Sequence, residues 1–401
     1  MSKENEVVIL SAVRTPIARF QGALAGIEAP KLGAVAIKAA VKRAGIKNPA
    51  DIDEVFMGNV VTAGEGQAPA RQASIFAGLP ESVGATTVNK VCGSGLKAIM
   101  FGAQAIKAGD GQLFVGGGME SMTRAPFLVG GRTGELRYGH ANLKDSLLHD
   151  GLWDPFEDWP MGDAADFIAT EYKATREAMD EFAAGSQQKA VAAIEAGKFK
   201  DEIVPVEILG RKGVVTIFDT DEGPRAGTTA EGLSKLRPVF SKDGRTTAGN
   251  ASTLNDGAAA VVVSSRAYAE ANDLKPLARI VSYGHSAVQP KRLFAAPAQA
   301  MPKILAKAGW TFDDVDLIEL NEAFAAQCLA NGYELADQGW DWDKVNVNGG
   351  GIALGHPIGA SGARIVATLI YALKDRGLKR GLAALCLGGG EAVAMAIELE
   401  D

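Results

Sequence analysis

Hydrophobic residues along the chain fall into short apolar runs, which alternate with segments where apolar residues recur every three or four positions. Residues 7–13 form an apolar run typical of a buried strand, and residues 32–44 carry the pattern of a helix that ends at Gly45. A strand over residues 51–60 and a helix over residues 68–79 follow. This alternation predicts an α/β protein built from β-α-β units.

The clearest junction between the two patterns lies at Cys92. Residues 88–91 continue a β-like run, whereas the apolar positions of residues 96–106 share one helical face. The first N–H groups of a helix have no partners and its dipole is positive there, so we expect a favoured thiolate and a nucleophile at Cys92. Gly93 and Gly95 leave room for a substrate carbonyl and for N–H groups that stabilise an oxyanion. Because free cysteines are often buried, this stretch alone leaves a packed cysteine equally open.

The signals of the first half return later in the chain in the same order. Residues 51–59, 88–108 and 114–120 are echoed by residues 312–321, 345–374 and 385–391. In this comparison residues 345–348 match the run that precedes Cys92, and a helix is expected over residues 361–374. We interpret the repeat as two α/β halves built on one plan, with chance similarity as the alternative.

The pattern changes between the halves. A strand over residues 112–115 runs into the glycine-rich residues 116–122, after which turn residues dominate and a long amphipathic helix covers residues 176–196. The core pattern resumes with Asn255-Asp256-Gly257 and a strand over residues 258–263. We therefore expect three parts, listed here by their residues: a first half of 1–120 plus 250–272, an inserted loop domain of 121–249, and a second half of 273–401.

The composition of the chain argues against several classes of protein. The net charge of −7 argues against nucleic-acid binding, which needs a basic face. Three cysteines make no disulfide framework and suit a reducing compartment, and none has the Cys-x-x-Cys spacing of a zinc site, so no metal is expected. The first apolar run is too short for a signal peptide, and no segment is long enough to span a membrane. We therefore expect a cytoplasmic protein.

Two residues of the second half are candidates to act with Cys92. His356 lies between Gly355 and Pro357 before a helix, where an imidazole could serve as the base for a thiol, although a hydrogen-bonded turn residue is the other interpretation. Cys386 ends an apolar run at a Gly-Gly-Gly turn. If the halves are related by a pseudo-twofold axis, Cys92 and Cys386 face one cleft. One thiol can then carry an acyl group while the other moves a proton, as carbon–carbon chemistry beside a thioester requires.

Six motifs, spread in order over nearly the whole chain, closely resemble those of the thiolases, the acyl-CoA:acetyl-CoA C-acyltransferases. They are Val91-Cys92-Gly93-Ser94-Gly95, residues 116–122, residues 249–257, Asn321-Glu322-Ala323-Phe324-Ala325, residues 350–362, and Cys386-Leu387-Gly388-Gly389-Gly390. The resemblance implies the α/β thiolase fold: two pseudo-twofold-related βαβαβαββ halves in five layers with an inserted loop domain. It also implies a homodimer or homotetramer.

The resemblance further implies a role for each site residue. Cys92 would take the acyl group and His356 would activate it, while Cys386 would exchange a proton with the α-carbon of acetyl-CoA. His356 and a water held by Asn321 would form one oxyanion hole. The backbone N–H groups of Cys92 and Gly388 would form the second.

Coenzyme A and acyl-CoA are expected as substrates, with no permanently bound cofactor. By the same resemblance Ser252 lies near the pantetheine. Arg225 is a candidate for the anionic nucleotide end, because a guanidinium suits phosphate, although a solvated surface arginine is equally open. Met161 is a candidate for the acyl pocket, with a core methionine as the alternative.

We therefore expect a ping-pong thiolase that condenses acyl-CoA with acetyl-CoA, or cleaves a short 3-ketoacyl-CoA, in fatty-acid metabolism or β-oxidation. The alternatives are a thiolase for longer or branched substrates, a decarboxylating condensing enzyme and a non-catalytic acyl-CoA-binding protein. Two departures leave the acyl preference open. Trp159-Pro160 replaces a histidine contact that many acetoacetyl-CoA thiolases carry, and Leu293-Phe294 replaces a Met-Gly pair.

Overall fold

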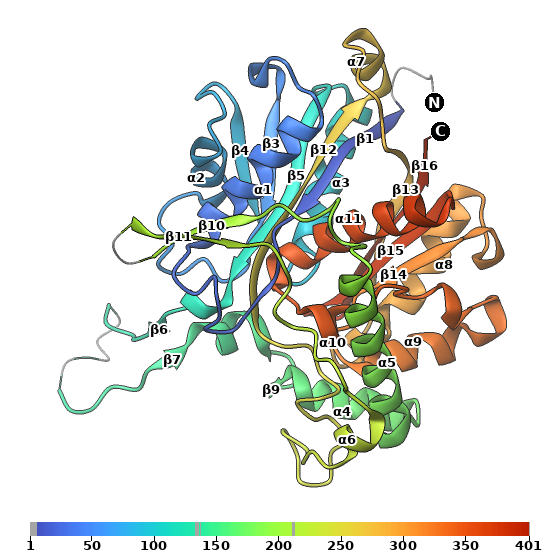
Figure 1. The fold of residues 1–401 in the computed structure, drawn as a ribbon. Helices are drawn as coiled ribbons and strands as arrows, with labels where there is room; N and C mark the ends of the chain where they lie inside the picture. Colours follow the sequence, from blue (N-terminus) through green and yellow to red (C-terminus); the bar gives the residue numbers. More distant parts are fainter. Residues whose placement is uncertain (1–5, 133–135, 137, 211–212, 401) are drawn as a thin grey trace.

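The computed structural model describes residues 6–132, 136, 138–210 and 213–400. Residues 1–5 and 401, on which the expectations about the ends of the chain partly rest, lie outside these ranges. The main sheet has the strand order β14-β15-β16-β13-β1-β12-β5-β3-β4, with β2 paired to β12. In Figure 1 the first half, in blue and cyan, lies beside the second half, in orange and red.

The strands of the main sheet are β1 (Val7–Arg14), β2 (Ala18–Arg19), β3 (Glu54–Gly58), β4 (Gly84–Val88), β5 (Leu113–Ser121), β12 (Asn255–Ser265), β13 (Ala278–Ala287), β14 (Leu317–Leu320), β15 (Arg380–Leu387) and β16 (Glu391–Leu399). Three small hairpins pair β6 (Phe127–Leu128) with β7 (Lys144–Asp145), β8 (Trp153–Asp154) with β9 (Trp159–Pro160), and β10 (Val206–Leu209) with β11 (Val215–Phe218).

The α-helices are α1 (Ala29–Arg43), α2 (Pro69–Phe76), α3 (Ser94–Ala108), α4 (Met161–Glu171), α5 (Arg176–Glu195), α6 (Ala230–Ser234), α7 (Arg266–Ala271), α8 (Ala296–Ala308), α9 (Ala325–Leu335), α10 (Gly351–Leu354) and α11 (Ile358–Arg376). No helix within the described ranges is both long and apolar enough to cross a membrane.

The sheet has the same plan when it is followed from either end. On one side β3 runs parallel to β5, and β5, β12 and β1 pair antiparallel. On the other side β14 runs parallel to β15, and β15, β16 and β13 pair antiparallel. The two sides join where Val8 and Ile9 of β1 pair with β13. This topology is the twofold repeat that the sequence predicts.

The two sides differ at one edge. The repeat predicts that residues 345–348 match the run before Cys92, but Val345 makes only an isolated bridge to Ile318, where the first half has strand β4. Asn346 has a left-handed backbone with φ of 46°. Its side-chain amide bonds the backbone N–H and C=O of Leu320, at 2.9 and 2.8 Å. A side chain therefore takes the partners that a further strand would have used.

Three apolar clusters define five layers. One cluster lies between α1, α2 and the first-half strands, and another lies between α8, α9 and the second-half strands. The largest apolar residues of α3 and α11 fill the cluster between the two sets of strands. The two central helices touch through glycines: a Cβ on Gly95 would lie 2.8 Å from the backbone nitrogen of Ala363, and one on Gly362 would collide with the backbone of Leu96. The fold is thus the five-layered α/β architecture that the resemblance implies.

Several strand bounds differ from the predicted ones. Strand β5 continues through the glycine-rich residues to Ser121. A side chain would not fit at Gly118, because a Cβ there would collide with the carbonyl oxygen of Gly359. These glycines therefore allow close packing against α11 inside a strand. Strand β12 already begins at Asn255, three residues before the strand predicted over residues 258–263. The residues are buried and pair with β5 and β2.

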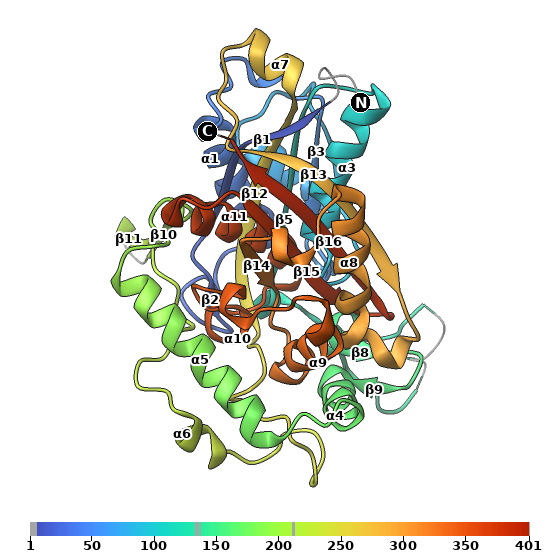
Figure 2. The same ribbon diagram turned by 90° about the vertical axis from the view of Figure 1, so that its right-hand side faces the viewer.

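The segment expected as an insertion forms the small hairpins and helices α4, α5 and α6. In Figures 1 and 2 helices α4 and α6 lie below the main sheet, whereas hairpin β10–β11 lies higher, where it packs against the first half. Helix α5 matches the predicted long helix closely. Because β12 pairs with both β1 and β5, residues 255–265 belong to the sheet of the first half. The exact division of the chain into three parts stays a prediction.

Candidate active site

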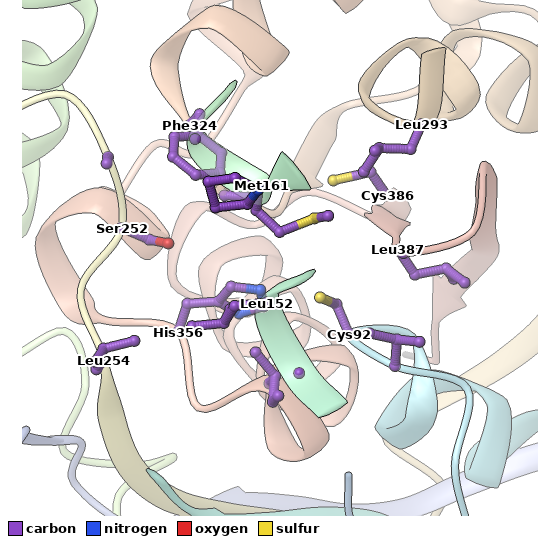
Figure 3. A pocket seen from close by; sticks show the side chains of 18 of the residues that line it. Cys92, Leu152, Met161, Ser252, Leu254, Leu293, Phe324, His356, Cys386 and Leu387 are labelled. Carbon is purple, nitrogen blue, oxygen red and sulfur yellow. The ribbon is translucent and has the colours of Figure 1, made fainter. Parts of the chain in front are cut away.

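A cavity of about 170 Å³ lies where the halves and the inserted segment meet. Its walls are mostly apolar, and three reactive side chains reach it: Cys92, His356 and Cys386. In Figure 3 the two sulfur atoms and the imidazole ring point into the same space. The structure therefore brings together the three residues that the sequence predicts as the reactive set.

Cys92 is positioned by a strained turn before α3. Val91 has a left-handed backbone with φ of 45°, which is unfavourable for a β-branched residue. The hydroxyl of Ser94 holds this turn, because it accepts from the N–H of Lys90 at 2.8 Å and donates to the carbonyl of Val91 at 2.6 Å. Local strain at a reactive residue of this kind is typical of functional sites.

The resting Cys92 is a thiol. Burial raises its pKa to about 12, and this effect outweighs the backbone N–H groups of Cys92 and Gly388, which lower the pKa of the same sulfur. The expectation that the helix start favours the thiolate is therefore wrong, because desolvation costs more than the N–H groups return. Those two N–H groups nevertheless point at the sulfur. If an acyl group were attached to Cys92, the oxyanion on its carbonyl carbon would lie beside this sulfur.

His356 is held as a neutral imidazole. Its backbone N–H donates to Asn255 at 2.9 Å, and its Nδ1 lies 2.6 Å from the hydroxyl of Ser361. Burial, with a smaller contribution from the positive charge of Arg364, lowers the pKa of His356 to about 3. A neutral imidazole can accept a proton, so His356 suits the role of base.

Cys386 lies at the end of β15, next to Leu387, and is almost fully buried. Burial raises the pKa of its thiol well above the usual value, and the neighbouring Cys92 raises this pKa further. The two thiols therefore lie close enough for their charges to interact, and an anion on one disfavours an anion on the other.

Asn321 reaches the site only through His356. It does not line the cavity, and its Nδ2 lies 3.5 Å from Nε2 of His356, at the outer limit of a hydrogen bond. Gly388 lines the cavity directly. The residues expected for the two oxyanion holes therefore lie apart, one set at the imidazole and the other at the Cys92 sulfur, and their roles stay predictions.

The candidates for coenzyme A binding occupy two adjoining hollows. Ser252 and Met161 line the same cavity as Cys92. Arg225 lies outside it, exposed, in a neighbouring hollow with Arg19. Thr253 lines both hollows and so joins them. A long substrate could lie across the two, with its anionic end near the arginines.

The two departures from the family pattern have different positions. Trp159 does not line the cavity, and its ring packs against Phe167 with centroids 5.8 Å apart. Leu293 and Phe294 do line it, and the Phe294 ring meets Phe324 edge to face at 5.2 Å. Pro160 of the first departure also lines the cavity, so both departures change its wall.

Glu120 is a buried carboxyl to which the sequence analysis gave no role. It accepts from the backbone N–H groups of Val60, Val61 and Gly359, at 3.1, 3.1 and 2.8 Å. Burial raises its pKa to about 7. Glu120 thus ties the first turn of α11 to the first-half sheet. Its position in the glycine-rich motif of residues 116–122 was the only available signal.

The comparisons with known proteins agree over the whole chain. The family models described as "Thiolase, N-terminal domain" and "Thiolase, C-terminal domain" match residues 7–267 and 274–399. An acetyl-CoA acetyltransferase of Pseudomonas aeruginosa is 56% identical over 98% of this chain and 99% of its own, and one of Cupriavidus necator has the same identity and coverage. The crystal structure of the Bacillus anthracis acetyl-CoA acetyltransferase superimposes with a TM-score of 0.95 and 44% identity, covering 98% of this chain and 99% of that one.

Proposed function

The chain belongs to the thiolase family and is an acyltransferase, and from this premise we propose that it interconverts a short 3-ketoacyl-CoA plus coenzyme A with acetyl-CoA plus an acyl-CoA. The observation that carries the proposal is the single apolar cavity reached by two thiols and one neutral imidazole. A hydrolase would need only one of the thiols.

Thiolysis begins at Cys92. His356 takes the thiol proton at Nε2 while the sulfur attacks the C3 carbonyl of the 3-ketoacyl-CoA. When the tetrahedral adduct collapses, the C2–C3 bond breaks and its electron pair leaves on the α-carbon of acetyl-CoA. Cys386 donates its proton to that carbon. The acyl group then remains on Cys92 as a thioester, and acetyl-CoA departs.

The second half-reaction restores both thiols. Cys386, now a thiolate, takes the proton of an incoming coenzyme A, whose sulfur attacks the acyl carbon on Cys92. The Cys92 sulfur leaves and recovers the proton held by His356, and acyl-CoA is released. The N–H groups of Cys92 and Gly388 stabilise the oxyanion of this step. His356 and a water held by Asn321 serve the enolate, and condensation is the same sequence in reverse.

We assign coenzyme A to the two adjoining hollows. Ser252 contacts the pantetheine, Met161 lies beside the acyl group, and Arg225 binds the anionic nucleotide end. The acyl group is short, because the cavity is small and the Phe294 and Phe324 rings limit its wall.

The resemblance to thiolases supports a homodimer or homotetramer and a place in fatty-acid metabolism, including β-oxidation. Three unpaired cysteines support a cytoplasmic location, because cytosolic thiols stay reduced. The direction of the reaction follows the metabolite levels.

The test is an assay of purified protein with acetoacetyl-CoA and free coenzyme A, in which loss of the 3-ketoacyl thioester is followed. We expect turnover with acetoacetyl-CoA. Turnover only with 2-methyl or longer 3-ketoacyl-CoA would replace the short-chain assignment by the branched or long-chain one. Absence of turnover with the whole panel would refute the proposed function and leave a non-catalytic acyl-CoA-binding protein.

A further inference from the structure

Three buried polar side chains form a row behind the cavity, and none of them lines it. Arg364, on α11, donates from Nη1 to Glu319 of β14 at 3.1 Å. From Nη2 the same guanidinium donates to Oδ1 of Asn321 at 3.4 Å. Asn321 in turn contacts His356. The row therefore connects an ion pair in the core to the imidazole of the active site.

This arrangement fixes the orientation of the Asn321 amide. A guanidinium has only donors, so the oxygen end of the amide must face Arg364. The nitrogen end then faces Nε2 of His356. The oxygen and nitrogen ends of an amide are nearly identical in shape. Without Arg364 the Asn321 amide could therefore rotate by half a turn, which would place its oxygen against the imidazole.

The tautomer of His356 depends on the same orientation. The hydroxyl proton of Ser361 goes to the carbonyl of Pro357 at 2.9 Å, so its oxygen accepts from Nδ1–H and Nε2 carries only a lone pair. An N–H of Asn321 suits this lone pair. An amide oxygen in its place would favour a proton on Nε2, and the imidazole would no longer accept the proton of Cys92.

We infer that Arg364 is a positioning residue, which holds the Asn321 amide with its nitrogen toward His356 and so keeps Nε2 unprotonated and able to act as the base. The inference rests on the proposed function. Arg364 and Ser361 lie three residues apart on α11, so one face of a single helix orients the imidazole on both sides.

The groups that act on the imidazole come from several elements. Arg364 approaches from α11 and pairs at 3.1 Å with Glu319 of β14, where burial raises the pKa of the carboxyl and the charge of Arg364 opposes that rise. The thiols of Cys92 and Cys386 face it across the cavity. Removing the charge of Arg364 therefore favours the imidazolium and shifts the acid limb of kcat/KM to higher pH.

The first test is Arg364→Met, assayed with acetoacetyl-CoA and coenzyme A at a pH above the acid limb. We expect kcat to fall about 10²-fold, as when one oriented donor of an oxyanion site is lost, with KM changed less than about two-fold. The matched control is Thr368→Val, one turn further along α11, which removes a buried hydrogen bond of 3.1 Å to Glu202 without touching Asn321. The control should lower the melting temperature and leave both kcat and the acid limb unchanged.

The second test places Arg364→Met in an Asn321→Ala background. If Arg364 acts on the rate through Asn321, the second substitution lowers kcat by less than about two-fold. A further fall of about 10²-fold would overturn the inference, because Arg364 would then act by another route.

Arg364→Lys keeps the experiment decisive if the methionine variant does not fold. Lysine keeps the charge but lacks the planar fork that holds Glu319 and Asn321 together, so kcat should fall about 10-fold while the acid limb stays in place. Wild-type kcat in a folded Arg364→Lys protein would refute the inference. Absence of activity in the wild type and in Thr368→Val would instead refute the proposed function.

Discussion

The starts of helices α3 and α11 occupy matching places in the two halves but carry different chemistry. Cys92 precedes α3, and the groups that reach its sulfur are backbone N–H donors of Cys92 and Gly388. His356 precedes α11, and its ring nitrogens meet the side chains of Ser361 and Asn321. A nucleophile that will carry an oxyanion needs fixed donors, whereas a base needs a fixed tautomer. One scaffold, used twice, supplies each with the partners it requires.

Among the proposed substitutions, Cys92→Ser should cause the largest loss of activity, because it removes the nucleophile of the first half. A serine hydroxyl is a far weaker nucleophile here, so we expect thiolysis to fall by at least about 10⁴-fold and no acyl group to be trapped on the protein. The trapped acyl group is measured after incubation with acetyl-CoA, either by mass spectrometry of the intact protein or, with radiolabelled acetyl-CoA, by counting the label on the protein. Acylation at an unchanged level would place the nucleophile elsewhere.

Cys386→Ser separates the two thiols. The variant should still form the acyl-enzyme from acetyl-CoA, because Cys92 and His356 are intact. Condensation and thiolysis should fall about 10³-fold, since no group of suitable acidity serves the α-carbon. Exchange of the α-protons of acetyl-CoA with deuterated water, followed by NMR, should stop as well. Normal turnover in this variant would show that Cys386 has no part in the proton transfer.

The pH dependence of Cys92 alkylation tests the neutral thiol and imidazole pair. The pKa of Cys92 is raised from 9.0 to about 12, so below that value the thiol dominates and the thiolate fraction at pH 7 is about 10³-fold lower than for an ordinary cysteine. The rate of alkylation by iodoacetamide, measured without substrate in the Cys386→Ser variant, should therefore rise about ten-fold per pH unit through pH 10. A plateau near pH 8 or below would mean that the resting sulfur is already an anion.

Ser361→Ala gives the smallest expected effect and tests whether Ser361 fixes the tautomer of His356. Loss of the Nδ1 partner allows the other tautomer, so kcat should fall about ten-fold, which corresponds to one hydrogen bond of about 1.4 kcal/mol. Ser282→Ala is the matched control, because it removes a buried hydroxyl that donates to Ile304 at 2.7 Å outside the cavity wall. Equal losses in both variants would reduce the role of Ser361 to stability.

The sequence predicts the repeat and the reactive trio because those signals are local. A cysteine followed by two nearby glycines at the start of a helix, a histidine between Gly355 and Pro357, and a cysteine at the end of a strand are each visible in a few neighbouring residues. The repeat then implies that they meet. The roles of Ser252, Arg225 and Met161 stay predictions, because they depend on a bound substrate.

The supporting residues could not be predicted in the same way. Arg364 and Ser361 lie within a long helix whose residues are almost all buried, and no sequence pattern tells which polar residue there turns toward Asn321. Glu120 lies inside strand β5, beyond residues 112–115, where the sequence predicts a strand. The missing fifth strand at Val345 depends on one side-chain amide, that of Asn346, which replaces backbone pairing. These features depend on tertiary contacts between distant segments.

The close packing of α3 against α11 at Gly95 and Gly362 has a consequence for how the protein can move. Because α3 and α11 touch with no space for even a methyl group, neither helix can slide along the other without breaking the shared core. The gap between nucleophile and base is therefore set by rigid scaffolding and does not widen to admit a substrate. Admission and release fall to cavity-lining segments outside these two helices, such as the one that carries Leu148 and Leu152. Mutations that change the range of substrates should therefore lie mainly in those segments and not at the packed surface between α3 and α11.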